Sequence, residues 1–213
     1  SGKGSGKILN QAQRRLFLIR SLLKEKTEYR DIAIPAEPES QRQLLRGLMN
    51  IRTPQSIGAD FLKMQDAYLQ GETAAKGITD VADLTPIRPG LYLWQGDITT
   101  LKCDAIVNAA NSGMTGCYIP NHRCIDNAIH TFAGVELRLA CAELMEQQGY
   151  PEPTGQAKIT PAFNLPCRYV LHTVGPIISG RVTKEDEELL ASCYRSCLEL
   201  AAENKLESVA FCC

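Results

Sequence analysis

The chain has 213 residues, of which 44% are hydrophobic and 22% are charged, and its formal net charge at pH 7 is −1. This size and composition are typical of a globular protein with one large domain, or with a medium domain and an appendage. A net charge so close to zero provides no global basic field for nucleic acid, and no apolar run is long enough to span a membrane.

Cysteine is frequent, with nine in the chain. An odd number, in a chain whose first residues lack the apolar segment of a secretory signal, does not indicate a disulfide framework. We therefore expect a cytoplasmic protein, in which cysteines within helical patterns, such as Cys141, behave as small buried apolar residues. Residues 1–7, SGKGSGK, are small and polar, and we interpret them as a linker or a tag remnant.

Residues 8–88 are predicted to form an N-terminal helical extension. Apolar residues recur at helical spacing from residue 8 to about 29, and the prolines of IPAEPES then break the pattern. Ser40 is a candidate N-cap of a second helix, and Asp60 is a candidate N-cap of a third, which is expected to stop near Gly71. A turn-rich connection follows at 73–90. Nothing in these helices indicates chemistry, so we interpret them as an appendage packed on the next domain.

Strands and helices alternate from residue 89 to 213, which predicts an α/β domain with a partly parallel sheet. A helix is expected at 124–148, where Gly134 indicates a close backbone approach or a packing constraint. A second helix is expected at 185–204, preceded by an approximate capping box of Thr183 and Asp186. The predicted strands are LYLWQGD (91–97), DAIVNAAN (104–111), GQAKIT (155–160), RYVLHTVGP (168–176) and SVAFCC (208–213).

The loop between the second strand and the first of these helices carries Cys117, His122 and Cys124. Thiolate and imidazole are preferred zinc ligands, and three protein ligands leave a fourth position for water or substrate. The residues favour a metal site, while two incidental cysteines beside a surface histidine, or a redox-active pair, remain open alternatives. Asp126, in the first turn of the helix, either complements the helix dipole or acts as a general base beside a metal-bound water.

Other polar residues lie at strand ends. Asn is depleted in strands, so the presence of Asn108 and Asn111 in a predicted strand requires an explanation. A turn explains one of them, and contact with a polar ligand explains the other. Asp97 is either a turn residue or an acceptor for a ligand amine. His130 and His172 are interpreted as structural.

Four motifs, in this order, resemble the MacroD-type branch of the macrodomains: QGDIT (95–99), DAIVNAAN (104–111), IDNAIHTFAG (125–134) and VLHTVGP (170–176). Members of that branch bind ADP-ribose and hydrolyse it from proteins. The resemblance covers roughly Leu91 to Cys213 and implies a mixed sheet flanked by helices.

One departure from the MacroD pattern is informative. SGMTGCYIPNHRC (112–124) replaces the family's glycine run and resembles a zinc-dependent microbial subfamily that also has a helical N-terminal extension. That subfamily is associated with sirtuin-like ADP-ribosyltransferases and lipoyl-carrier substrates. The resemblance implies that Cys117, His122 and Cys124 hold a catalytic Zn²⁺.

The resemblance also implies residue roles. Asp97 would bind the adenine amino group beside the Ile98 backbone. Asn111 would hold the distal ribose, and Asp126 would orient or activate water or contact that ribose. Asn111 and Asp126 are thus the expected catalytic residues, which position the reacting groups. Ile125 would also line the ADP-ribose site. Macrodomains usually continue past a strand like SVAFCC into a phosphate-binding loop, so residues 89–213 are expected to form a macrodomain without its C-terminal portion.

The expected function is zinc-dependent removal of ADP-ribose from mono-ADP-ribosylated proteins, with a lipoyl-carrier protein as one candidate target and with no nucleic-acid or membrane partner. The alternatives are a non-catalytic ADP-ribose reader with a structural zinc, and a redox sensor that uses Cys117 and Cys124.

Overall fold

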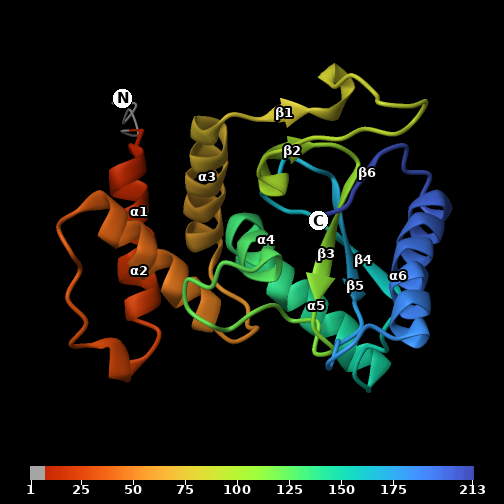
Figure 1. The fold of residues 1–213 in the computed structure, drawn as a ribbon. Coiled ribbons are helices and arrows are strands. Elements are labelled where there is room, and N and C mark those ends of the chain that lie inside the picture. The colour runs from red at the N-terminus through yellow and green to blue at the C-terminus, as the bar shows by residue number, and fades with distance from the viewer. Residues whose placement is uncertain (1–7) are drawn as a thin grey trace.

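The computed structural model describes residues 8–213, so the predicted linker or tag remnant lies outside the described residues (Figure 1). The helices are α1 (Gln11–Leu23), α2 (Pro38–Ile51), α3 (Ala59–Lys76), α4 (Ile125–Ala133), α5 (Val135–Gln148) and α6 (Lys184–Glu203). The strands are β1 (Thr79–Asp80), β2 (Leu101–Lys102), β3 (Ala105–Ala110), β4 (Ala157–Pro161), β5 (Tyr169–Val174) and β6 (Val209–Ala210). Three short 3₁₀ helices are η1 (Thr27–Tyr29), η2 (Val81–Asp83) and η3 (Ile98–Thr100). No described helix is both long and apolar enough to cross a bilayer.

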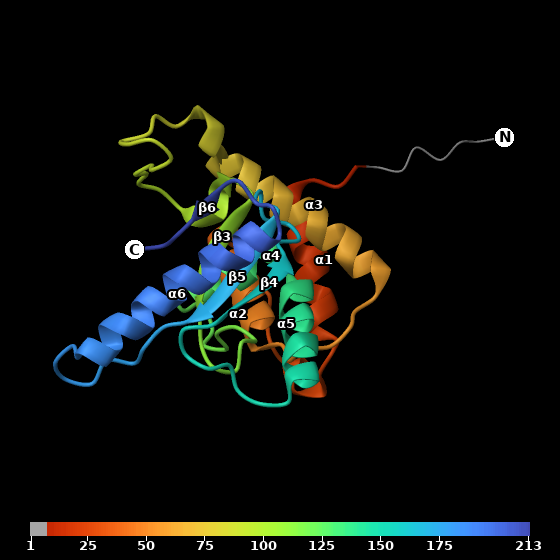
Figure 2. The same ribbon diagram turned by 90° about the vertical axis from the view of Figure 1, so that its right-hand side faces the viewer.

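The main sheet has the order β4-β5-β3-β6, in which β3 is parallel to β5 and β6 while β4 is antiparallel to β5. Successive side chains of a strand point to opposite faces. Ile106 and Val170 accordingly pack against α4 and α5, whereas Val107 and Leu171 pack with residues of α6. Figure 2 is viewed from the side that carries α6. The predicted α/β class with a mixed sheet flanked by helices is confirmed.

The three N-terminal helices have a hydrophobic core of their own, which includes Leu18, Leu45 and Phe61. They stand beside α4, which lies between them and the sheet (Figure 1). The prediction of three helices is therefore correct, and the way they pack places α2 and α3 against the loop and helix that follow β3.

The predicted ends of these helices are partly wrong. The second helix begins at Pro38 rather than after Ser40, because proline is already set for the first helical position. The third begins after Gly58, so Asp60 lies in its first turn instead of capping it. This helix also continues past Gly71, where the missing side chain makes room for Gln11 of α1; a Cβ there would lie 2.7 Å from Gln11 Nε2.

The predicted strand at 91–97 is wrong. Only an isolated bridge between Arg88 and Leu91 occurs there, and Leu93 is 78% exposed. A strand requires a hydrogen-bonding partner, and none of the described residues provides one for this segment. The final predicted strand is shorter than expected, since only Val209 and Ala210 pair with β3.

Two local predictions are confirmed. Thr183 and Asp186 form a complete capping box at the start of α6. Gly134 separates α4 from α5 with a φ of 103°, in the region that favours glycine. A Cβ at Gly134 would lie 2.7 Å from the buried Gln65 of α3, so the glycine meets both a backbone and a packing requirement.

Candidate active site and metal centre

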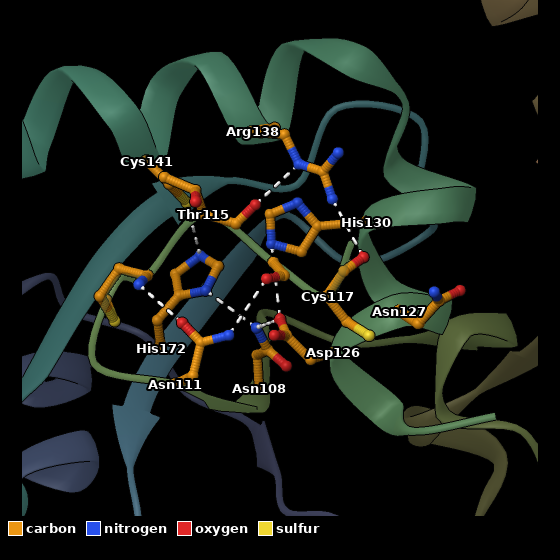
Figure 3. A network of polar contacts seen from close by, with 12 residues as sticks. Asn108, Asn111, Thr115, Cys117, Asp126, Asn127, His130, Arg138, Cys141 and His172 are labelled. Atoms are coloured by element: carbon orange, nitrogen blue, oxygen red, sulfur yellow. Dashed lines mark hydrogen bonds and ion pairs between the residues drawn. The ribbon is translucent and has the colours of Figure 1, made fainter. Parts of the chain in front are cut away.

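Polar residues of the two central strands meet beneath the start of α4. Asn108 of β3 lies level with His172 of β5, and both are fully buried. Asn108 Nδ2 donates to Asp126 Oδ1 at 2.8 Å and lies 3.2 Å from His172 Nδ1 (Figure 3). On the other side of the ring, His172 Nε2 lies 2.9 Å from Thr160 Oγ1. Both ring nitrogens of His172 are thus engaged, which fits the structural role predicted for it.

Asp126 is the second residue of α4 and is only 5% exposed. Burial raises the pKa of Asp126, and the hydrogen bond from Asn108 and the charge of Arg138 partly oppose that shift. His130 follows one turn later, with Nε2 at 3.5 Å from Asp126 Oδ1, and burial lowers its pKa so that the ring is neutral. A carboxylate with a raised pKa suits the work of a general base.

The loop before α4 brings together Cys117, His122 and Cys124, whose ligand atoms all lie within 4.8 Å of one another. All three are at least partly accessible to solvent. Burial raises the pKa of Cys124, and the adjacent Cys117 and Asp126 raise it further. A cation bound there would hold both cysteines as thiolates in spite of this shift, and two sulfur atoms with one imidazole fit zinc while leaving a fourth position open.

A second group, His130, Cys141 and His172, also holds its ligand atoms within 4.8 Å. Its three residues are buried, and both nitrogens of His172 already have partners in Asn108 and Thr160. A metal there would break at least one of these buried contacts. Of the two groups, the loop triad is therefore the better candidate for a metal.

The loop of residues 112–124, which carries Cys117, His122 and Cys124, is called the metal loop below. Arg138 of α5 fixes this loop to the end of α2. Its guanidinium is buried and donates to the backbone oxygens of Thr115 at 2.7 Å and Cys117 at 3.1 Å. It also donates at 2.7 Å to the backbone oxygens of Asn50 and Arg52 at the C-terminal end of α2. One side chain thus connects the metal loop, α5 and the helical extension.

α2 supplies two further contacts to the same loop. Arg46 Nη2 donates to the His122 backbone oxygen at 3.2 Å and to Asn127 Oδ1 at 2.9 Å. Asn50 Oδ1 accepts from the Asn121 backbone nitrogen at 2.9 Å. The sequence interpretation of the extension as an appendage without chemistry missed these residues. A usable signal existed, because Arg46 and Asn50 are four positions apart and so share one side of a helix.

Asn111, which directly follows β3, shapes the entrance to the loop. Its Oδ1 accepts from the backbone nitrogens of Gly113 and Met114, and its Nδ2 donates to the Gly116 backbone oxygen at 3.1 Å. The side chain therefore forms the turn that one of the two asparagines was expected to form. Its contact with a ribose stays a prediction.

The residues predicted for the adenine end lie together near α4. Asp97 caps η3, with Oδ1 accepting from the Thr99 backbone nitrogen at 2.9 Å, and its side chain is 47% exposed. Ile98 and Ile125 are partly buried and pack on the same apolar cluster. An exposed carboxylate beside two apolar residues can accept from a ligand amine and contact a flat apolar ring.

Comparison with known proteins identifies the family. A family model described as Macro domain matches residues 107–213. A protein from Treponema medium named "Protein-ADP-ribose hydrolase" is 60% identical over 209 residues, covering 96% of this chain and 80% of that protein. A Staphylococcus aureus (strain MSSA476) protein of the same name is 48% identical over 199 residues, covering 92% and 74%. The crystal structure of a Trypanosoma brucei macrodomain in complex with ADP is 30% identical, with a TM-score of 0.56, covering 80% of this chain and 73% of that one. The chain belongs to the macrodomain family.

Proposed function

We propose that the protein is a zinc-dependent hydrolase that removes ADP-ribose from mono-ADP-ribosylated proteins. The observation that carries the proposal is the convergence of Cys117, His122 and Cys124 beside the buried carboxylate of Asp126. The relatives at 60% and 48% identity, both named protein-ADP-ribose hydrolase, support the reaction class. The proposal includes a cytoplasmic location and, as a candidate target, a lipoyl-carrier protein modified by a sirtuin-like transferase.

Cys117, His122 and Cys124 would hold the zinc, which would supply a Lewis acid. The chain's own residues do the remaining work. Asp126 is held in one orientation by Asn108 and is shielded from solvent, so its carboxylate can accept a proton from an attacking water. Asp97, with Ile98 and Ile125, would hold the adenine end, which fixes the position of the distal ribose relative to Asp126.

The test compares Asp126→Ala with Cys117→Ser. We expect Asp126→Ala to retain stoichiometric zinc and to lose at least about 100-fold in the rate of ADP-ribose release. Cys117→Ser should lose both zinc and turnover, because it removes one of three ligands. Cys213→Ser is the matched control, since its thiol is exposed and lies outside the loop. Zinc is measured by mass spectrometry, and release is measured with a mono-ADP-ribosylated protein.

Undiminished hydrolysis by Asp126→Ala would refute the role of that carboxylate. Stoichiometric zinc with tight ADP-ribose binding, but no release from several modified proteins, would instead identify a reader module with a structural metal. Loss of zinc without loss of turnover would exclude a catalytic metal.

A further inference from the structure

A cleft with a volume of about 690 Å³ lies between α2, α3, α4 and the metal loop. This volume is in the range of about 300–1,000 Å³ in which proteins bind ligands. Apolar side chains, including Leu45, Leu69 and Phe132, form part of its lining. None of the residues assigned above to zinc or ADP-ribose lines it, so the cleft is separate from that site although it adjoins the metal loop.

The charges that line the cleft are mainly positive: Arg42, Arg46, Lys76 and Arg123, against Glu39 and Glu72. Arg42 pairs with both carboxylates, at 2.9 Å from Glu72 and 3.6 Å from Glu39. The other three cations therefore face the cleft without a carboxylate partner among its lining residues.

Two of these cations contact the same aromatic ring. The Lys76 Nζ lies 3.4 Å, and the Arg46 guanidinium carbon 5.8 Å, from the centroid of the Phe132 ring. Burial lowers the pKa of Lys76 and the charge of Arg46 lowers it further, while the charges of Asp97 and Glu72 raise it. Asp97 lies 4.0 Å from Lys76, but both side chains are more than a third exposed, which weakens that pair. Partly buried like charges that share one aromatic ring are stabilised by an added anion.

The arrangement favours an extended anion over a compact one. Lys76 and Arg46 lie at the Phe132 ring, on α3 and α2, and the third cation, Arg123, lies in the metal loop. Arg46 itself donates to the His122 backbone oxygen, so the cleft leads directly to the metal loop. The net charge of −1 provides no global basic field of the kind that favours nucleic acid.

We propose that this cleft docks an acidic segment of the ADP-ribosylated protein, with aspartate and glutamate side chains facing Arg46, Lys76 and Arg123. The inference rests on the proposed function and specifies its substrate class. A segment held there places an adjoining modified side chain at the metal loop, and the protein would select acidic targets.

The experiment compares Lys76→Gln/Arg123→Gln with the control Lys24→Gln/Lys63→Gln, which removes two exposed positive charges outside the cleft. The probes are a fluorescein-labelled oligoglutamate, followed by fluorescence anisotropy at low salt, and free ADP-ribose, followed by calorimetry. We expect the cleft variant to bind oligoglutamate about tenfold more weakly than wild type, with ADP-ribose affinity and zinc content unchanged. With an acidic modified protein, KM should rise while kcat stays the same.

Equal oligoglutamate affinity in the two double variants and wild type would overturn the proposal. A loss of ADP-ribose affinity in the cleft variant as large as its loss of oligoglutamate affinity would overturn the proposal too, because the cleft would then belong to the nucleotide site. Tighter binding of a single-stranded RNA than of oligoglutamate would replace the acidic protein by nucleic acid. The wild-type protein could also show no turnover while the cleft variant still binds oligoglutamate more weakly than wild type. That result would refute the proposed hydrolase function and would still support the cleft as a surface for acidic peptides.

Discussion

Replacing Arg138 by Met tests whether one buried side chain holds the metal loop to the extension. Methionine keeps the apolar stem but removes the donors to Asn50, Arg52, Thr115 and Cys117. A hydrogen bond to a charged group contributes about 1.5–3 kcal/mol to stability. The contributions of several bonds made by one group are not additive. The desolvation that lowers the pKa of Arg138 also offsets part of the gain. The substitution leaves four backbone carbonyl oxygens without this donor. A buried acceptor left unsatisfied costs about 1–3 kcal/mol, and because such losses are not additive we expect the free energy of unfolding to fall by about 3–5 kcal/mol.

A loss of this size is a large fraction of the roughly 5–15 kcal/mol that stabilises a protein. At about 2–4 °C per kcal/mol for a chain of this length, Arg138→Met should lower Tm by roughly 6–20 °C, as measured by calorimetry. The control is Arg168→Met, since the Arg168 side chain is 64% exposed and its pair with Asp104 spans 3.6 Å. This change should cost less than about 1 kcal/mol. Zinc affinity of Arg138→Met should fall about 10–100-fold, as expected when the groups that support metal ligands are lost.

Equal Tm values for Arg138→Met and Arg168→Met would refute the reasoning. A lower Tm with unchanged zinc affinity would show that Arg138 secures α2 but does not position the metal ligands.

Two further predictions concern packing and pH. Gly134→Ala should destabilise the protein by about 2–4 kcal/mol in urea unfolding, because it combines a positive φ with a contact to Gln65, and a loss below 1 kcal/mol would contradict this. Burial lowers the pKa of His172 from 6.5 to about 4, so the unfolded chain takes up its proton first as the pH falls. Stability from neutral His172 is therefore complete above about pH 6.5 and is lost towards pH 4, by up to about 3 kcal/mol. Urea unfolding from pH 7 to 4.5 should show this slope, and His172→Gln should reduce it, leaving the part that comes from the buried His130. An equal slope in both proteins would assign the pH dependence to other groups.

Features encoded by neighbouring residues were predictable from the sequence. The capping box of Thr183 and Asp186 requires only two residues three positions apart, and it forms as expected. Gly134 was recognisable because a glycine within a helical pattern indicates a special backbone or packing requirement. The structure shows both, a positive φ and the close approach of Gln65. The predicted strand at 91–97 failed because strand formation depends on a partner elsewhere in the chain, which local alternation cannot reveal.

In the candidate site, too, residues close together in the sequence were predicted and residues with distant partners were missed. Cys117, His122 and Cys124 lie within eight consecutive positions, so their chemistry was readable as one pattern, and the structure brings their ligand atoms together. Arg46 and Arg138 were missed because their partners are distant in the chain. Arg46 contacts a residue 76 positions away, and Arg138 contacts one 88 positions away. Such contacts depend on how α2 packs against the α/β domain; the spacing of Arg46 and Asn50 places them on one side of a helix but does not identify what that side contacts.

These long-range contacts change how the extension should be understood. The carbonyl groups that end α2 and those that shape the metal loop share one guanidinium, and Asn50 binds the loop at a second point. Neither segment can reach its observed geometry without the other, because each would leave buried polar groups unpaired. α2 also lines the cationic cleft through Arg46, which donates to the backbone of His122. A partner that binds in the cleft therefore contacts the same residue that supports a candidate metal ligand, which physically links target recognition to the geometry of the metal loop.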